Sequence, residues 1–397
     1  MKKTRMNRFV IAGAALAAAI ARAGDVQAAK AAATQYQIVN LPSLGGTNSK
    51  GNSIDNRGWV SGYSNFAGNQ RRHATLWRDG VATDLGTLGG NNSNIAWPVK
   101  NNSGRLSGIS QTSTPDPLGE NWSCSAFFPG ATATGFTCLG FIWEDGVLEA
   151  LPTLGGNNGF ATGTNNRGQT VGWAENTVHD STCVAPQVLQ FRAVVWGPAA
   201  SQIAELPLVS GDTSSAATAI NDRGQVVGIS GRCDQAVGRF TAIHAVLWDR
   251  GIVTDIGNLG RFSWNTPMAL NEGGDIAGFA PVDDTDPDNP QLHAFVKLKG
   301  SAIQDIGTLS GDLFSEALGI NRFRQVVGIS CANADGSGTC RAFLWQEGTM
   351  TDLNTLVVPG YPNLLTVAQD INDAGVITGR ALTPTGQRPA YIATPLP

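Results

Sequence analysis

The chain has 397 residues, of which 27 are Lys or Arg and 31 are Asp or Glu, so its formal net charge is −4 at pH 7. Charged residues make up 15% of the chain, against about 25% in ordinary globular domains, and they form no blocks. Nucleic acid is therefore excluded as a partner, because phosphate binding needs a concentrated basic face. The 49 Gly residues and the 42% hydrophobic content argue against disorder and favour short strands joined by tight turns.

The N-terminus is typical of a secretory signal peptide. Basic residues from Lys2 to Arg8 precede an uncharged, mostly apolar run over residues 9–21. As a helix this run covers about 20 Å, short of the ~30 Å hydrocarbon core, so a cleaved signal fits better than a retained membrane helix. Small residues place the cleavage after residue 23 or 28. We therefore assign residues 1–28 to the signal and predict a chain exported to the periplasm or the medium, without a membrane partner after cleavage.

The rest of the chain repeats one phrase seven times: an Asx residue, a turn, a short apolar strand and a Gly. The Gly, seven residues after the Asx, never varies within the chain. The Asx positions are Asp55, Asn101, Asn165, Asn221, Asn271, Asn321 and Asn372. The period of about 50 residues matches the blade length of a β-propeller.

Each unit is predicted to form four antiparallel strands. In the fourth unit, strands at residues 217–221 and 225–228 flank a turn at 222–224, and strands three and four follow at 244–248 and 252–256. The Asx side chain can bond the backbone of that turn, and Gly takes the positive φ that the turn requires. Four-stranded units at this period predict a β-propeller, whose closure leaves no long sheet edge exposed.

The two ends of the repeat region are complementary. Residues 36–46 supply a fourth strand and a connector without the three strands before them, and the last unit stops after its third strand at 390–393. We therefore predict one all-β, seven-bladed propeller over residues 36–397, closed by the N-terminal strand. A linear β-solenoid gives no reason for complementary ends. Because a closed ring is stable without a partner, we expect a monomer.

These phrases together resemble the HAF-repeat family of bacterial extracellular proteins. The likeness is clearest at residues 84–90, 220–230, 244–248, 293–295 and 342–345. Arg324 departs from it at a turn Gly, and Lys297 departs from it at the Trp of a third strand. The resemblance implies secretion and repeat architecture, and it brings no catalytic residue and no cofactor with it.

All six cysteines fall in the predicted loops between second and third strands. An even number of cysteines in a secreted chain is consistent with three disulfides, although six cysteines allow fifteen connectivities. We pair Cys124 with Cys138, Cys331 with Cys340, and Cys183 with Cys233 across neighbouring blades.

Most His and Trp residues are interpreted as structural, because they recur at the same place in the repeat. His73, His244 and His293 begin third strands, where we expect bonds or packing within the blade. Five of the ten Trp residues end third strands, where we expect blade-to-blade packing: Trp77, Trp143, Trp196, Trp248 and Trp345.

Function is sought where the repeat is broken. The irregular insertions 109–138, 174–190 and 279–292 all belong to one end of the predicted blades, and variable loops on a rigid frame are where ligands usually bind. The candidate ligand-binding residues, all expected to be exposed, are Trp122, Phe127 and Phe128 for stacking, with Glu175, His179 and Asp180 as polar groups. Packing inside the insertion is the alternative interpretation of the aromatic residues.

No catalytic residue is predicted. The serine-nucleophile motif Gly-x-Ser-x-Gly is absent. Glu175, His179 and Asp180 form only a small acid–base group without a nucleophile beside it. Asp284, Asp286 and Asp288 form a weak calcium candidate that lacks the central Gly and the final Glu of a calcium loop, so no metal site and no cofactor are predicted. We expect a non-catalytic binding module for an extracellular glycan or protein; the alternative is a polysaccharide hydrolase or lyase with its site on the same face.

Overall fold

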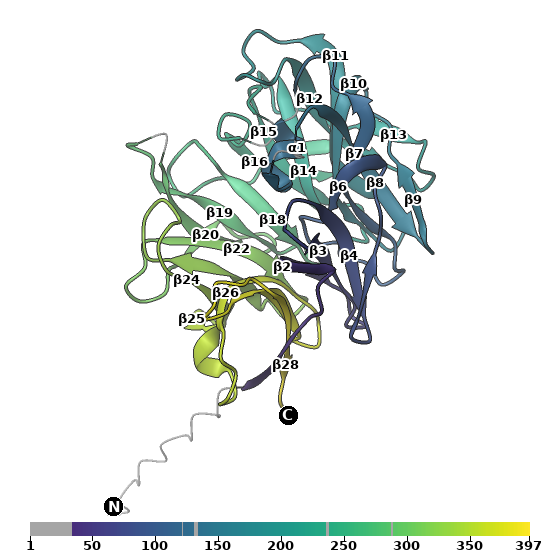
Figure 1. The fold of residues 1–397 in the computed structure, drawn as a ribbon. Coiled ribbons are helices and arrows are strands. Elements are labelled where there is room, and N and C mark those ends of the chain that lie inside the picture. The colour runs from purple at the N-terminus through teal and green to yellow at the C-terminus, as the bar shows by residue number, and fades with distance from the viewer. Residues whose placement is uncertain (1–33, 121, 131–133, 236–237, 287–288) are drawn as a thin grey trace, which may run out of the picture. The chain divides into compact units, whose positions relative to one another are not determined.

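Seven four-stranded antiparallel sheets form residues 34–397, so the predicted seven-bladed β-propeller is confirmed (Figure 1). The computed structural model describes residues 34–120, 122–130, 134–235, 238–286 and 289–397, with the backbone alone at 122 and 123. The predicted signal peptide lies outside the described residues. Within them, no helix is long and apolar enough to cross a membrane.

In blades 1 to 6 the four strands follow one another outward in chain order. Blade 1 comprises β2 (Gly45–Ile54), β3 (Val60–Phe66), β4 (Arg72–Arg78) and β5 (Val81–Asp84). Blade 2 comprises β6 (Gly89–Asn94), β7 (Leu106–Pro115), β8 (Phe136–Glu144) and β9 (Val147–Ala150). Blade 3 comprises β10 (Gly155–Thr164), β11 (Thr170–His179), β12 (Leu189–Trp196) and β13 (Ile203–Glu205). Blade 4 comprises β14 (Ser214–Ile220), β15 (Val226–Gly231), β16 (His244–Asp249) and β17 (Ile252–Asp255). Blade 5 comprises β18 (Thr266–Leu270), β19 (Ile276–Asp283), β20 (Gln291–Lys297) and β21 (Gln304–Gly307). Blade 6 comprises β22 (Phe314–Ile320), β23 (Val326–Cys331), β24 (Cys340–Gln346) and β25 (Thr349–Asp352). Among the described residues, the short helix α1 (Trp122–Phe127) and the 3₁₀ helix η2 (Leu353–Leu356) lie outside the sheets.

The ring closes as the complementary ends predict. Blade 7 comprises β26 (Leu364–Ile371), β27 (Ile377–Leu382), β28 (Ala390–Pro395) and, as its fourth strand, the N-terminal β1 (Tyr36–Asn40). β1 pairs antiparallel with β28, with Tyr36 opposite Pro395 and Asn40 opposite Tyr391. Blade 7 in turn packs against β2 of blade 1. The first and last residues of the propeller are therefore held in one sheet.

The invariant Gly is required by a close approach of the first two strands. In every blade a Cβ added to this Gly would overlap with the backbone carbonyl oxygen of the same position on the first strand. Those seven carbonyls belong to Lys50, Asn94, Phe160, Ala216, Thr266, Glu316 and Val367. No larger residue fits there. These seven first-strand residues are therefore structurally equivalent, and we call them the inner tier.

The Asx residue fixes the turn and links the blades. Its side-chain oxygen accepts hydrogen bonds from the turn backbone, as between Asn221 and the amides of Arg223 and Gln225, both at 3.1 Å. In five blades the Asn amide also donates to the carbonyl of the Asx residue in the next blade. The bond from Asn372 to Asp55 joins residues 317 positions apart in the chain. We call this circle of bonds the amide ring.

The turn glycine has one exception, Arg324. The six turn glycines have φ values between +76° and +91°, and Arg324 adopts a φ of +65°. A non-glycine residue rarely takes this left-handed conformation. The Nε atom of Arg324 lies 3.0 Å from the Asp275 carboxylate, which is an ion pair that a glycine would lack.

The repeated His and Trp side chains are structural, as predicted. The Nδ1 atoms of His73, His244 and His293 contact a fourth-strand Asp of their own blade at 2.8 to 2.9 Å. The indole of Trp196 donates to the carbonyl of Pro152 at 2.8 Å, in the connector from the preceding blade. Trp77 and Trp248 make the same bond to Pro42 and Pro207.

All three predicted disulfides are present: Cys124–Cys138, Cys183–Cys233 and Cys331–Cys340. No free cysteine remains in the described part of the chain. Cys183–Cys233 links the loop after β11 to the loop after β15, and so joins blades 3 and 4. Three disulfides are typical of proteins that fold in an oxidising compartment.

Candidate functional site

The two ends of the propeller axis differ. One end, the turn face, carries the Asx turns between first and second strands. The other, the loop face, carries the loops between second and third strands. All three disulfides lie in these loops or at the strand ends beside them, since Cys138, Cys331 and Cys340 belong to strands β8, β23 and β24 rather than to the predicted loops. Each end has a hollow on the axis, of about 120 Å³ at the turn face and about 510 Å³ at the loop face.

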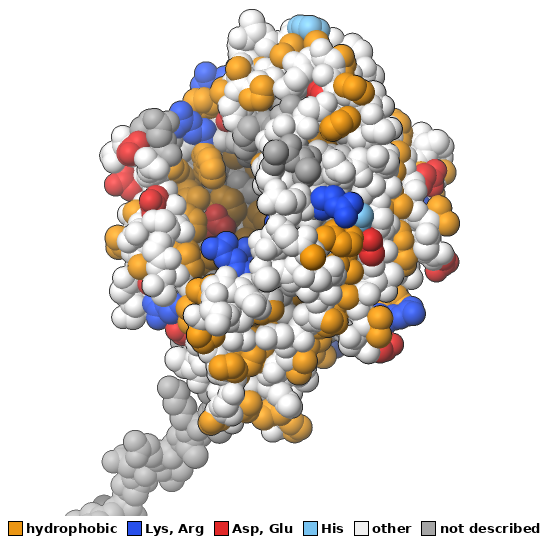
Figure 2. All heavy atoms as spheres, viewed as in Figure 1, with side chains coloured by type: hydrophobic (Ala, Val, Ile, Leu, Met, Phe, Trp, Pro, Cys, Tyr) orange, Lys and Arg blue, Asp and Glu red, His pale blue; other side chains and the backbone are white. Residues whose placement is uncertain are grey.

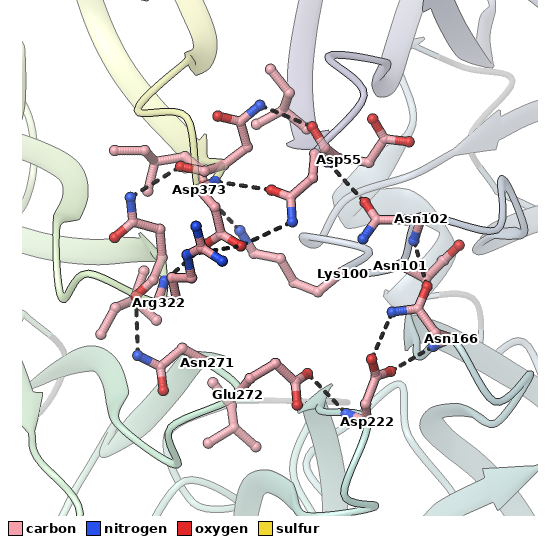
Figure 3. Close-up of a pocket in the computed structure, with 17 residues that line it drawn as sticks. Asp55, Lys100, Asn101, Asn102, Asn166, Asp222, Asn271, Glu272, Arg322 and Asp373 are labelled. Atoms are coloured by element: carbon pink, nitrogen blue, oxygen red, sulfur yellow. Dashed lines mark hydrogen bonds and ion pairs between the residues drawn. The ribbon is translucent and has the colours of Figure 1, made fainter.

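At the turn face the polar groups bond one another (Figure 3). The residue after each Asx accepts a hydrogen bond from the backbone amide of the equivalent residue in the blade before it, as Asp222 does from Asn166 at 2.7 Å. Six blades follow this pattern. It breaks between Glu272 and Arg322, because a guanidinium has no acceptor atom.

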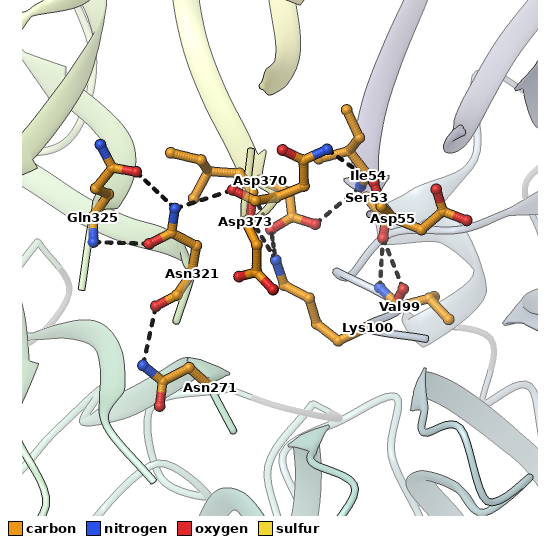
Figure 4. Close-up of polar contacts among 12 residues, drawn as sticks. Ser53, Ile54, Asp55, Val99, Lys100, Asn271, Asn321, Gln325, Asp370 and Asp373 are labelled. Atoms are coloured by element: carbon orange, nitrogen blue, oxygen red, sulfur yellow. Dashed lines mark hydrogen bonds and ion pairs between the residues drawn. The ribbon is translucent and has the colours of Figure 1, made fainter. Parts of the chain in front are cut away.

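An ion pair crosses the axis just inside the amide ring (Figure 4). Lys100 of blade 2 donates to the carboxylate of Asp370 in blade 7 and to the carbonyl of Ile371. The Asp370 side chain is fully buried and also accepts from the amide of Ile54 at 3.0 Å. Burial raises the pKa of Asp370, against the opposite effect of Lys100. These groups are therefore occupied in holding blades 7, 1 and 2 together.

The larger hollow, which we call the central cavity, opens between the loops of the loop face. Its walls include Met268 from β18 and Phe279 from β19, and Trp97, Trp264 and Phe240 from segments between strands. Its size lies within the ~300–1,000 Å³ typical of small-molecule sites. A second hollow of about 360 Å³ shares Trp264 and Glu316 with it. Figure 2 shows a hollow with mainly hydrophobic walls and with acidic and basic side chains inside and beside it.

Charged residues gather on one side of the axis, on blades 6, 7 and 1. Glu316 and Lys50 belong to the inner tier, and Arg380 lies opposite inner-tier Val367 in the β26–β27 pair. Within the described residues, none of these three side chains makes a hydrogen bond or an ion pair. Arg72 lies nearby, over the ring of Tyr63 at 3.7 Å, and its guanidinium donates to Asn65 and to the carbonyl of Phe127.

Burial shifts the pKa values of this group toward neutrality. Desolvation first, and then the charges of Arg380 and Arg72, lower the pKa of Lys50 to about 7, against the opposite effect of Glu316. Desolvation raises the pKa of Glu316 to about 7, against the opposing charge of Lys50. A Lys and a Glu that both titrate near neutral pH beside a cavity are typical of functional sites.

Two aromatic features of the cavity favour a ligand. The indole Nε1 of Trp97 is buried and has no hydrogen-bond partner among the described residues, although buried indoles usually have one. Trp264 is 37% exposed and has a φ of +51°. Bulky residues seldom adopt this strained backbone, and such strain concentrates at functional sites.

The candidate aromatic residues lie deeper than the sequence analysis predicts. Phe128 is 6% exposed, so its expected exposure is wrong. Phe127 is half-buried and packs edge-on against Trp97 and Phe160, with ring centroids 5.5 and 5.0 Å away. Both belong to the central hydrophobic cluster, because the insertion folds back onto the blades. The side chain of Trp122 lies outside the described residues.

The polar candidates do not form one group. His179 is exposed and, in the described part of the chain, bonds to neither Glu175 nor Asp180. Asp180 is half-buried and accepts hydrogen bonds from its own loop, including the Thr182 amide at 2.8 Å. Glu175 is 3% exposed, so its expected exposure is also wrong.

Glu175 and Glu120 are a buried acidic pair that joins two insertions. Both accept from the side-chain amide of Gln187, and Glu175 also accepts from the backbone amides of Asn157 and Asn158. The Oε2 atom of Glu120 is buried without a hydrogen-bond partner among the described residues. Burial first, and then the charge of Glu120, raise the pKa of Glu175 to about 8. Glu175 therefore carries a proton at neutral pH.

This proton makes folding stability depend on pH. The pKa of Glu175 is about 8 in the folded chain and about 4.3 in the unfolded chain, so the folded state holds an extra proton between these values. The free energy of unfolding that this proton contributes is fully present below about pH 4. It is lost as the pH rises through 8, by up to about 1.4 kcal/mol per pH unit. We expect Glu175→Gln to remove this slope in urea titrations between about pH 5 and 8. Exposed Glu149→Gln is the control, and an unchanged slope in Glu175→Gln would contradict the assignment.

The structure does not bring the weak calcium candidates together around a common point. Asp284 lies 3.5 Å from Arg261, and Asp286 accepts from Asn289 within its own loop. Asp288 lies outside the described residues. Among the described residues, the acidic, His and Cys groups close enough to share a metal are Asp180, Cys183 and Cys233. Because the two cysteines form a disulfide, they offer no thiolate to a metal.

The sequence analysis did not single out Lys50, Glu316, Arg380 or Trp264. A signal for the first two was present, since the other inner-tier positions hold no charged residue. Trp264 lies outside the repeated Trp position, which also marks it as a residue that the framework does not require.

Comparisons with solved structures give propeller folds at very low identity. The propeller domain of the Trilobed protease from Pyrococcus furiosus is 8% identical, covers 90% of this chain and 93% of its own, and has a TM-score of 0.47. Pyrococcus horikoshii acylaminoacyl peptidase is 10% identical, with 92% of this chain and 52% of its own covered and a TM-score of 0.46. Trypanosoma rangeli sialidase is 9% identical; the match covers 90% of this chain and 58% of the sialidase chain, with a TM-score of 0.39. No family model and no curated protein matches the chain.

Proposed function

We propose that the chain is a secreted, non-catalytic binding module that holds an extracellular glycan or protein on its loop face. The central cavity carries the proposal, because its aromatic walls include the buried indole nitrogen of Trp97 and its lining includes the carboxylate of Glu316, and neither group has a hydrogen-bond partner among the described residues. At the turn face, by contrast, most polar groups already bond one another. Export and membership of the HAF-repeat family are part of this proposal; the three disulfides and the basic and apolar N-terminus support export.

A screen of the oxidised protein on immobilised polysaccharides and extracellular proteins tests this function, with retention and product release scored separately. We expect retention without product, and a loss of affinity of about tenfold or more in Trp264→Ala, because an aromatic platform at a binding site is worth about 1–3 kcal/mol. Phe323→Ala is the matched control, because Phe323 is 60% exposed and lies in an Asx turn at the other end. Equal losses in both variants, or no retention of any candidate, would contradict the proposal.

A polysaccharide hydrolase or lyase is the second candidate, and one observation favours it. Lys50 and Glu316 have pKa values near 7 and no hydrogen-bond partner among the described residues, which suits a general acid–base pair. Product release that is abolished by Glu316→Gln but retained in Glu149→Gln would replace the binding module with the enzyme.

A further inference from the structure

The central cavity has two unlike sides. One side is aromatic and comes from blades 2, 4 and 5 and their loops, with Trp97, Phe279, Phe240 and Trp264. Glu316 and Thr266 of the inner tier line the cavity. Lys50 holds the equivalent inner-tier position on blade 1 and Arg380 lies opposite the one on blade 7. Arg380, Glu316 and Arg72 are close enough for their charges to act on the pKa of Lys50. A ligand that fits both sides has an apolar face for the aromatic rings and a charged group for the basic residues.

The basic side chains need a counter-charge that the described chain does not supply. Lys50, Arg72 and Arg380 carry three positive charges when ionised, against one negative charge on Glu316. Asp234 and Arg239, which also line the cavity, add one charge of each sign and leave this excess unchanged. Arg380 and Lys50 form no ion pair with Glu316 or with any other described acid. Half-buried cations are normally paired, because desolvation penalises an isolated charge. An anionic ligand would supply the missing partner.

The remaining groups are those that a sugar uses. The Glu316 carboxylate can accept hydrogen bonds from hydroxyl groups, and the unpaired Nε1–H of Trp97 can donate one to a ligand oxygen. Trp264 and Phe240 are each 37% exposed at the cavity, where they can stack on the apolar face of a pyranose ring. Hydroxyl groups, an apolar ring face and an anionic group occur together in acidic saccharides.

Resting on the proposed binding function, we infer that the central cavity recognises a saccharide that carries a carboxylate, with the carboxylate paired to Lys50 and Arg380 and the ring on the aromatic side. Carboxylate pairs with Lys and Arg are charge-assisted and therefore strong. The aromatic side favours a uronate polymer over an acidic polypeptide, whose carboxylates stand on flexible chains without a flat ring.

The pH response gives a second readout. Lys50 loses its proton and Glu316 loses its own as the pH rises through about 7. Both changes make the cavity more negative. The other charged groups are Arg72 and Arg380, which act on Lys50, and Asp234 and Arg239, which line the cavity. Binding of a carboxylate should therefore weaken between about pH 6 and 8, and Lys50→Met should flatten this dependence.

The test uses polygalacturonate, alginate and hyaluronate, each compared with its carboxyl-methylated ester, and poly-glutamate as the peptide arm. We expect at least one polyuronate to bind about tenfold or more tightly than its ester, and a similar loss in Lys50→Met and Arg380→Met. Lys299→Met, which removes the same charge from the turn between β20 and β21, should bind normally. Near-ultraviolet circular dichroism and urea titration check that each variant is folded.

Three results would overturn the inference. Equal binding of acid and ester, or unaltered binding in both cavity variants, would show that the carboxylate is not recognised there. Tighter binding of poly-glutamate than of every polyuronate would assign the cavity to acidic polypeptide. Retention of neutral glycans alone would overturn the acidic-saccharide inference but would still support the binding module. Retention of no polymer and no protein in the wider screen would overturn both proposals.

Discussion

A chain that begins at Ser43, and so lacks β1, is expected to lose about 5 kcal/mol or more of folding free energy. Tyr36 is 1% exposed and Ile38 is 9% exposed, and burying such a side chain is worth about 1.5–3 kcal/mol. Removing β1 also uncovers the edge of β28 and deprives Trp77 of the Pro42 carbonyl that its indole bonds. The loss is comparable with the whole stability of many domains, about 5–15 kcal/mol.

Urea titration of the truncated chain measures this effect, with a chain that begins at Gln35 as the control. A synthetic peptide of residues 34–42 should restore part of the lost stability, because β28 still offers the edge on which β1 adds. If the truncated chain unfolds at the same urea concentration as the control, closure of the ring through β1 is not what stabilises the propeller.

Lys100→Met is expected to cost about 3–5 kcal/mol, because it leaves the buried Asp370 carboxylate without its cation. The free-energy loss should shrink as the pH falls. Without Lys100 the already raised pKa of Asp370 rises further, and protonation then removes the unpaired charge.

The double variant Lys100→Met with Asp370→Asn is the decisive comparison. An Asn at 370 can still accept from the amide of Ile54, so the double variant should recover much of the stability that the single variant loses. Lys299→Met controls for the loss of a surface lysine. A double variant that is less stable than Lys100→Met would show that the two side chains do not act as a pair.

The repeat allowed the framework to be predicted, because each element of it recurs. The closure through residues 36–46 followed from the complementary ends, and the pairing of Cys183 with Cys233 followed from loops on neighbouring blades. The physical need for the invariant Gly did not follow. Its recurrence alone does not explain why glycine stands there, and the structure shows a backbone carbonyl too close for any side chain.

The insertions could not be placed in the same way, because they have no period. Phe128 and Glu175 were expected to be exposed, and both are buried where insertions pack onto the blades. Nothing in the local sequence marks Glu120 as the partner of Glu175 across two blades.

Charged residues at repeat positions that are otherwise small or apolar also indicate special roles, and the sequence analysis did not use them. Lys100 directly precedes its Asx residue, where the other units have Ile, Leu or Thr, and Asp370 stands at a position otherwise held by small or apolar residues. Such departures mark residues that the framework does not require. The sequence alone does not pair them, because the choice of partner depends on which blades face one another across the axis.

The direction of the amide ring has an electrostatic consequence. Each linking Asn donates to the following blade, so the side-chain dipoles run head to tail around the circle. Dipoles arranged in this way largely cancel, unlike those of a helix, which add along one direction. The ring therefore holds the blades together while creating little field along the axis. The potential inside the central cavity is then set by the ionised side chains around it, and a single substitution at Lys50 or Glu316 changes that potential without altering the ring.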